Sequence, residues 1–319
     1  MHEPTYRQAI ANAWHLVWHN KILWIFGMLS AVLGELSLND FLGRMWWLSD
    51  KSATNDWWQK IQITVQPIGG WTETVGWVWV GAIILCLTVF FTFIAVSSQG
   101  ALIAASGEMF EKKKVDFSEA WKQGVKHFWK VLALNVFRGL ALFFLTILFW
   151  FFCLNFFAMG GFSGFLCLAI FSCVVFILAL AVSIMFIYSA GYAVLENKNI
   201  ISSIRGGWLM FSKHLLVSCE VSLFFLFLNF VLIAILFLGG FIVFLPSLVV
   251  WTVAGLTGYA EIMVLGLILG FLLLAVFIVI AGGLLNAFTT TVWMYLFVKM
   301  RKEGVVSRII HYIKKIIKK

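Results

Sequence analysis

Charged residues are scarce in this chain of 319 residues: Asp, Glu, Lys and Arg make up 12% of it, and only 14 residues are acidic. In contrast, 62% of the residues are hydrophobic and the mean hydropathy is +1.00. Soluble globular domains carry about 25% charged residues, so this composition excludes an ordinary water-soluble domain. The sequence predicts an all-α integral membrane protein instead.

The sequence also lacks the residue patterns of common catalytic sites. It contains no phosphate-binding loop, nucleophile elbow, zinc-protease motif or dinucleotide-binding glycine motif, and its few acidic residues form no obvious catalytic dyad. His15 and His19 stand four residues apart and could share a metal on one helix face, but no nearby carboxylate or cysteine completes the ligand set. We therefore expect a protein that is not an enzyme, with no cofactor and no metal site.

Cysteine is rare, and all five residues lie within or beside apolar stretches: Cys86, Cys153, Cys167, Cys173 and Cys219. None belongs to a C-x-x-C pair or stands at the spacing of a metal-ligand set. We interpret them as small core residues with no role in disulfide or iron–sulfur chemistry.

Six apolar stretches are present, and a membrane span requires about 20 such residues. They cover residues 22–38, 77–105, 131–158, 162–195, 215–238 and 262–298. We predict that they pair into three helical hairpins of one membrane domain, residues 1–298, followed by a tail at residues 299–319. Residues 239–261 are apolar and contain Pro246, and they either extend the flanking helices or form a re-entrant turn.

Basic residues are concentrated between alternate apolar stretches and near the two ends of the chain. Nineteen of the 23 Lys and Arg residues lie in four such segments: the N-terminal region, residues 112–130, residues 198–213 and residues 299–319. The positive-inside rule places these segments in the cytoplasm. We predict a multi-pass protein of the cell membrane with both termini cytoplasmic, in contact with anionic lipid at the cytoplasmic face and without a nucleic-acid partner.

The clearest pattern is an internal repeat ahead of the first, third and fifth apolar stretches. In each copy a tryptophan follows Ala or Gly, and basic, His or Asn residues stand five and six positions later. The residues are Trp14 with His19, Trp121 with His127, and Trp208 with His214. Tryptophan prefers the headgroup level of a bilayer, so each copy predicts an interfacial amphipathic helix, with His127 and His214 contacting headgroups. The repeat units cover residues 5–105, 115–195 and 200–298.

Two ionisable residues lie inside the apolar stretches: Arg138, eight residues after Lys130, and Glu220, six residues after His214. At about 1.5 Å per helical residue, both lie at a similar depth in the membrane. We predict an ion pair between Arg138 and Glu220 that supports helix packing. The alternatives are coupling to a proton or substrate, and snorkelling of the side chains towards the headgroups.

Two further segments are expected to act at the membrane surfaces. The outer loop of the first hairpin contains Trp46, Trp47, Trp57 and Trp58. These predict a short helix in the outer headgroup layer or, alternatively, an aromatic platform for a partner, a lipid headgroup or a glycan. The C-terminal tail combines isoleucines at helical spacing with Arg308, Lys314, Lys315, Lys318 and Lys319. It predicts a basic amphipathic helix on the anionic inner leaflet, or an arm that docks on an acidic protein partner.

The repeated aromatic-x-x-Ala-Trp pattern, the opening run Trp14…Asn20-Lys21-Ile22-Leu23-Trp24…Gly27 and the basic inner loops resemble an uncharacterised bacterial family of multi-pass membrane proteins. That family is similar to the membrane domain found ahead of some glycerophosphodiester phosphodiesterases. The resemblance covers residues from about 5 to 298, and it implies a six-span helical module with envelope or lipid functions.

Because the sequence contains no phosphodiesterase domain, the resemblance does not imply that activity. We expect a non-enzymatic membrane protein that acts as a scaffold, an anchor or a lipid- and envelope-associated module. The alternative is a transporter or channel for a small solute or lipid, in which the repeats form a pseudo-symmetric helical bundle.

Overall fold

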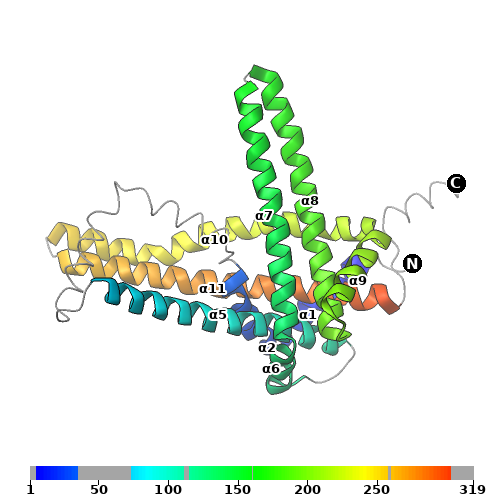
Figure 1. Cartoon of the computed structure of the whole chain (residues 1–319). Helices are drawn as coiled ribbons and strands as arrows, with labels where there is room; N and C mark the ends of the chain where they lie inside the picture. The colour runs from blue at the N-terminus through cyan, green and yellow to red at the C-terminus, as the bar shows by residue number, and fades with distance from the viewer. Residues whose placement is uncertain (1–4, 35–72, 111–114, 160, 258–259, 303–319) are drawn as a thin grey trace.

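The computed structural model describes residues 5–34, 73–110, 115–159, 161–257 and 260–302 (Figure 1). Within these residues the chain is helical and forms nine α-helices. They are α1 (Thr5–His19), α2 (Lys21–Gly34), α5 (Glu73–Phe110), α6 (Phe117–Lys126), α7 (Phe128–Met159), α8 (Gly161–Leu195), α9 (Ile200–Lys213), α10 (Leu215–Thr257) and α11 (Ala260–Lys302). The predicted all-α class is confirmed for the described part of the chain.

Five helices, α5, α7, α8, α10 and α11, are long and apolar enough to cross a membrane. Helix α2 begins the first predicted span, but its 14 residues extend only about 21 Å at the usual rise per residue. The hydrocarbon core of a bilayer is about 30 Å thick, and the rest of the first apolar stretch lies outside the described residues. The structure therefore supports a helical membrane protein with five spanning helices in its described part, where the sequence predicts six.

Two of the predicted outer connections lie largely within the described residues. Helix α7 ends at Met159 and α8 begins at Gly161, whose φ of +66° lies in the left-handed region that glycine adopts without strain. Helix α10 continues to Thr257, past Pro246. Residues 239–257 therefore extend the flanking helix, which confirms that alternative over a re-entrant turn.

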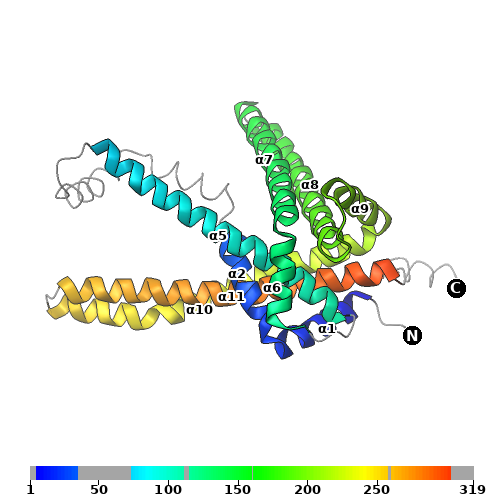
Figure 2. The same cartoon turned by 60° about the horizontal axis from the view of Figure 1, so that its bottom comes forward.

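The long helices leave a shared base in three directions (Figure 2). The α7–α8 hairpin forms one arm, the α10–α11 hairpin forms the second and α5 forms the third, while α2 packs against α5 and α11. The short helices α1, α6 and α9 lie at the base. Large fully buried side chains, among them Phe26, Tyr188 and Phe297, mark the core where the arms meet.

The distal parts of the arms are apolar and exposed, as Phe144 and Trp150 on α7 and Phe237 on α10 illustrate. Four of the five cysteines are exposed on the long helices as well: Cys86, Cys167, Cys173 and Cys219. The prediction that the cysteines are core residues is wrong for these four. Lipid tails are as apolar as a protein core, so an apolar neighbourhood in the sequence does not reveal which side of a spanning helix is packed.

Candidate functional site

Each of the three short helices meets the apolar helix that follows it through a single non-helical residue. The break residues are Asn20 between α1 and α2, His127 between α6 and α7, and His214 between α9 and α10. Each follows a repeat tryptophan by six positions. The carbonyl groups of these three residues accept hydrogen bonds from the first turn of the following helix, at 3.1, 3.0 and 3.0 Å. The chain therefore changes direction at these residues while their carbonyl groups keep hydrogen-bond partners.

The residue before each repeat tryptophan packs into the base. These three small residues are Ala13, at 0% exposure, Ala120, at 2% exposure, and Gly207, which is buried. In contrast, Trp14 and Trp208 are 56% and 57% exposed. Trp121 is half-buried, with its ring stacked against that of Phe26 at 6.4 Å. The small residue thus marks the packed face of each short helix, and Trp14 and Trp208 mark the outer face.

Helix α9 approaches α8 closely at Gly207. A Cβ atom at this position would lie 2.7 Å from the carbonyl oxygen of Met185 and 2.9 Å from the backbone nitrogen of Ser189. Gly124 has the same role between α6 and α5, where a Cβ atom would lie 2.8 Å from the backbone nitrogen of Ala101. Small residues therefore bring the helix backbones together, as they do in many membrane helix pairs.

The short helices contact the long helices in a cyclic order. Helix α6 packs on α5 and α9 packs on α8, in both cases the long helix that precedes it. Helix α1 packs on α11 at the other end of the chain, with Asn12 Nδ2 3.2 Å from the Tyr295 hydroxyl and Lys299 Nζ 2.6 Å from Gln8 Oε1. Each short helix thus packs on the last long helix of another predicted unit. The second unit packs on the first, the third on the second, and the first on the third.

His127 is only 2% exposed and joins two connections of the base. Its Nδ1 lies 2.9 Å from the carbonyl oxygen of Gln123, and its Nε2 lies 3.2 Å from Oδ1 of Asn197 in the turn between α8 and α9. Lys130 Nζ donates to the same Oδ1 at 2.6 Å and to the backbone carbonyl of Asn197 at 3.1 Å. His127 is therefore a structural link between helices, which differs from the expected headgroup contact.

Asn197 is a position that the sequence alone does not single out. Its φ of +53° lies in the left-handed region, which Asn adopts more readily than most other residues with a side chain. Helices commonly end on a residue in this conformation. The polar run Glu196-Asn197-Lys198-Asn199 after the fourth apolar stretch is the signal that points to this turn.

The other two repeat histidines are more accessible. His19 is exposed, with its Nδ1 2.8 Å from the carbonyl oxygen of His15 and the two imidazole rings stacked at 3.9 Å. His214 is half-buried, and its partial burial, together with the neighbouring charge of Lys213, lowers the pKa of its imidazole. Within the described ranges, no group of three or more His, Cys, Asp or Glu side chains could hold a metal ion.

The structure does not bring Arg138 and Glu220 together as an ion pair. Among the described residues, Glu196 forms ion pairs with Lys198 at 2.8 Å and with Arg301 at 3.2 Å. Arg138 lies on α7, which packs along α8, whereas Glu220 lies on α10, which packs along α11. Equal depth on two helices does not make two side chains neighbours, because helix pairing and rotation decide which residues meet.

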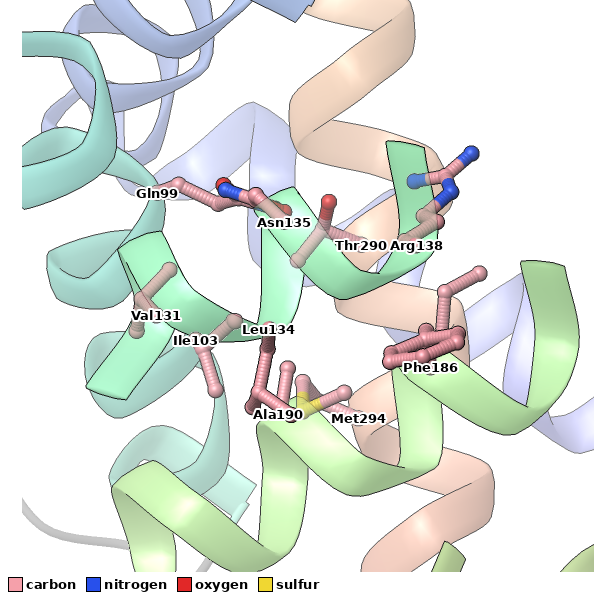
Figure 3. Close-up of a pocket in the computed structure, with 11 residues that line it drawn as sticks. Gln99, Ile103, Val131, Leu134, Asn135, Arg138, Phe186, Ala190, Thr290 and Met294 are labelled. Atoms are coloured by element: carbon pink, nitrogen blue, oxygen red, sulfur yellow. The ribbon is translucent and has the colours of Figure 1, made fainter. Parts of the chain in front are cut away.

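Arg138 instead lines a small pocket where α5, α7, α8 and α11 meet (Figure 3). The pocket has a volume of about 50 Å³, and its polar lining residues are Gln99, Asn135, Arg138 and Thr290. Asn135 Nδ2 donates to Gln99 Oε1 at 2.6 Å. The sequence reasoning missed Gln99 and Thr290, although an uncharged polar residue inside an apolar stretch is a usable signal.

A larger hollow of about 240 Å³ lies beside this pocket, at the ends of α5, α8 and α11 and against α6. Its polar and charged lining includes Glu108, Lys126, His127, Asn197 and Arg301. Both spaces are lined by residues of α5, α8 and α11, among them Ile103 and Ala104 on α5. In the described part of the chain, a hollow with charged lining residues thus lies against α6, and a smaller pocket with four polar lining residues lies among the long helices.

Two groups of predicted residues lie outside the described part of the chain. They are the outer tryptophans Trp46, Trp47, Trp57 and Trp58, and the tail residues Arg308, Lys314, Lys315, Lys318 and Lys319. Their expected membrane contacts stay predictions.

In comparisons with known proteins, no family model, no curated protein and no solved structure matches this chain. The resemblance to the bacterial membrane family therefore stays a prediction.

Proposed function

We propose that the protein is a non-enzymatic module of the cell membrane that anchors or scaffolds a lipid- or envelope-associated process at the cytoplasmic face. The observation that carries this proposal is the orientation of two short helices: Ala13 and Gly207 face the base, whereas Trp14 and Trp208 face outward. Tryptophan has an apolar ring and a polar N–H, so it is favoured at the headgroup level. The short helices therefore form a surface suited to the membrane interface.

The distribution of charge supports placing the base at the cytoplasmic face of the membrane. Lys122, Lys126, Lys213 and Arg301 are exposed on or beside the base, while the arms carry apolar side chains. An excess of Lys and Arg near the ends of spans is typical of the cytoplasmic side, and each cation near an anionic leaflet contributes about 1 kcal/mol. We place the base and both chain ends in the cytoplasm, with the basic tail against anionic lipid or an acidic protein partner.

We further propose that the chain consists of three repeat units with six spans. Two observations support the repeat: the equal spacing from tryptophan to break residue, and the cyclic order in which α1, α6 and α9 contact α11, α5 and α8. In this arrangement the repeat tryptophans are distributed around the base, so a lipid surface or a partner meets several similar helices.

A transporter or channel for a small solute or lipid is the second candidate. One observation favours it: Arg138, Gln99, Asn135 and Thr290 place polar groups in a pocket between apolar helices. At about 50 Å³, the pocket has room for only a few water molecules. A space of this size holds a polar group but does not form a path across a bilayer, so the anchoring function is preferred.

The test compares what co-purifies with the full chain and with the double variant Trp14→Ala/Trp208→Ala in native-lipid particles. Trp150→Ala is the matched control, because Trp150 is equally exposed but lies on the α7 arm. Mass spectrometry is expected to find a stoichiometric protein or anionic lipid that the double variant loses and the control retains. The same composition in all three samples would contradict the proposal.

Truncation after Lys302 tests the tail in the same assay. If the tail recruits the partner, the truncated chain loses that partner while keeping its place in the membrane. Uptake of a solute by vesicles that contain the full chain, and not by empty vesicles, would favour the transporter alternative.

A further inference from the structure

Arg138 is a cation within a membrane-spanning helix, ten residues after Phe128 at the start of α7. This spacing corresponds to about 15 Å along the helix. Among the described residues, Glu196 forms ion pairs with Lys198 and Arg301, and no described residue forms a hydrogen bond or ion pair with the Arg138 guanidinium. A charge in apolar surroundings is costly unless an opposite charge meets it, so the site calls for an anion from outside the described chain.

The polar neighbours of Arg138 are neutral. Asn135 and Gln99 bond to each other through Nδ2 and Oε1 at 2.6 Å, which leaves the Gln99 NH₂ group as a further donor. The described lining of the pocket includes the hydroxyl group of Thr290 and contains no acidic residue. A guanidinium group matches two oxygens of a phosphate or carboxylate at once. This set of side chains therefore selects an anion over a cation.

The size and surroundings of the pocket limit what the anion is attached to. In Figure 3, the Arg138 guanidinium points away from Leu134 and Met294, which belong to the apolar lining. The volume of about 50 Å³ suits a phosphate group but not an acyl chain. Phe137 and Leu140, beside Arg138 on α7, are exposed, and they provide apolar surface on which a chain can lie.

We propose that Arg138 anchors an anion-binding site that takes the phosphate group of an anionic amphiphile from the surrounding bilayer. Such an amphiphile would be a ligand for the lipid-associated function proposed above, and its assignment as a lipid rests on that function. A phospholipid and free phosphate present the same oxygens to the guanidinium, so the experiment has to separate these two sources.

The test is native mass spectrometry of the full chain in nanodiscs of phosphatidylcholine with a known fraction of phosphatidylglycerol. The wild-type chain is expected to retain phosphatidylglycerol in preference to phosphatidylcholine. Arg138→Gln is expected to retain it at least about tenfold more weakly, because charge-assisted hydrogen bonds are lost. Arg138→Lys keeps the charge without the planar two-point contact, so its retention is expected to lie between the two.

Arg205→Gln is the matched control, because it removes an exposed guanidinium from the short helix α9 and should not change retention. Equal retention by the wild type and Arg138→Gln would overturn the proposal. Equal losses in Arg138→Gln and Arg205→Gln would also overturn it, since net charge would then explain the effect. If Arg138→Gln does not fold, lipid retention by the wild-type chain is the test. Retention by the wild type without preference for phosphatidylglycerol refutes a lipid ligand.

Inorganic phosphate and the detergent-solubilised chain form the second arm. Arg138-dependent binding of inorganic phosphate without lipid preference would support the anion site and identify free phosphate as its source, and binding of neither refutes the site. Failure of the proposed function gives a different result from failure of the anion site. If only the proposed function is wrong, retention of phosphatidylglycerol still depends on Arg138, but no co-purifying component depends on Trp14 and Trp208.

Discussion

Nε2 of His127 lies 3.2 Å from Oδ1 of Asn197, so the break between α6 and α7 is tied to the turn between α8 and α9. Lys130 Nζ donates to the same oxygen at 2.6 Å. This contact joins the second predicted repeat unit to the connection that precedes the third. The arrangement of the short helices therefore depends on polar contacts centred on the buried His127 as well as on the packing of small residues.

Replacing His127 with Ala is expected to lower the free energy of unfolding by about 1–3 kcal/mol, because the packing of the buried imidazole and its two hydrogen bonds are lost. Thermal unfolding in detergent, followed by tryptophan fluorescence, measures the change. His19→Ala is the control, since His19 is exposed, and its Tm should stay close to that of the wild type. Equal shifts in the two variants would show that the His127 contacts do not hold the base together.

Gly207→Ala is expected to destabilise the protein, because the new Cβ atom would lie 2.7 Å from the carbonyl oxygen of Met185. Forcing an extra methyl group into a packed interface costs about 1–3 kcal/mol. Gly139→Ala is the matched control, since nothing lies within 4 Å of a Cβ atom at that position. Its stability should be unchanged or up to about 1 kcal/mol higher, because Ala favours the helix more than Gly does. A Tm of Gly207→Ala at or above that of Gly139→Ala would argue against close packing of α9 on α8.

The stability of the protein is expected to decrease as the pH is lowered, because His214 takes up a proton. Burial, with a smaller effect from Lys213, lowers the pKa of this imidazole in the folded chain, so the unfolded chain binds the proton more tightly. The contribution is complete above about pH 6.5, the ordinary value for His, and is lost as the pH falls from there towards the lowered pKa. Tm measured between pH 7.5 and 5.5 should fall less steeply for His214→Gln than for the wild type, and parallel curves would refute this assignment.

Glu196→Gln is expected to cost about 0.5–1 kcal/mol, because Glu196 forms ion pairs with Lys198 and Arg301 at the end of α8, and ion pairs whose cations are exposed to solvent contribute little each. The loss in Tm should shrink at high salt, which screens charges at this partly exposed site. Glu119→Gln on the exposed face of α6 is the control and should show almost no loss at any salt concentration. A salt-independent loss would indicate that packing of the side chain, and not its charge, is responsible.

Hydropathy predicts the long helices closely where lipid tails and packed protein both favour apolar side chains. Residues 162–195 are predicted as a span, and α8 runs from Gly161 to Leu195. The repeat pattern likewise locates the short helices, because the requirement for a small buried residue beside an outward tryptophan is local. The candidate site is predicted only in part: Arg138 is identified as unusual from the sequence, but its neighbours Gln99 and Thr290 are more than 35 and 150 residues away along the chain.

The sequence by itself determined the helical class, the positions of the apolar stretches and the tryptophan-to-break spacing, because each depends on residues within a few turns of one another. Only the tertiary structure decided that α1 packs on α11, that His127 is buried beside Asn197, and that Arg138 lines a pocket with Gln99 and Asn135 and does not pair with Glu220. The physical reason is that an apolar helix in a membrane is nearly uniform around its circumference. Its rotation and its partners are then set by a few small and polar residues that act across long sequence separations.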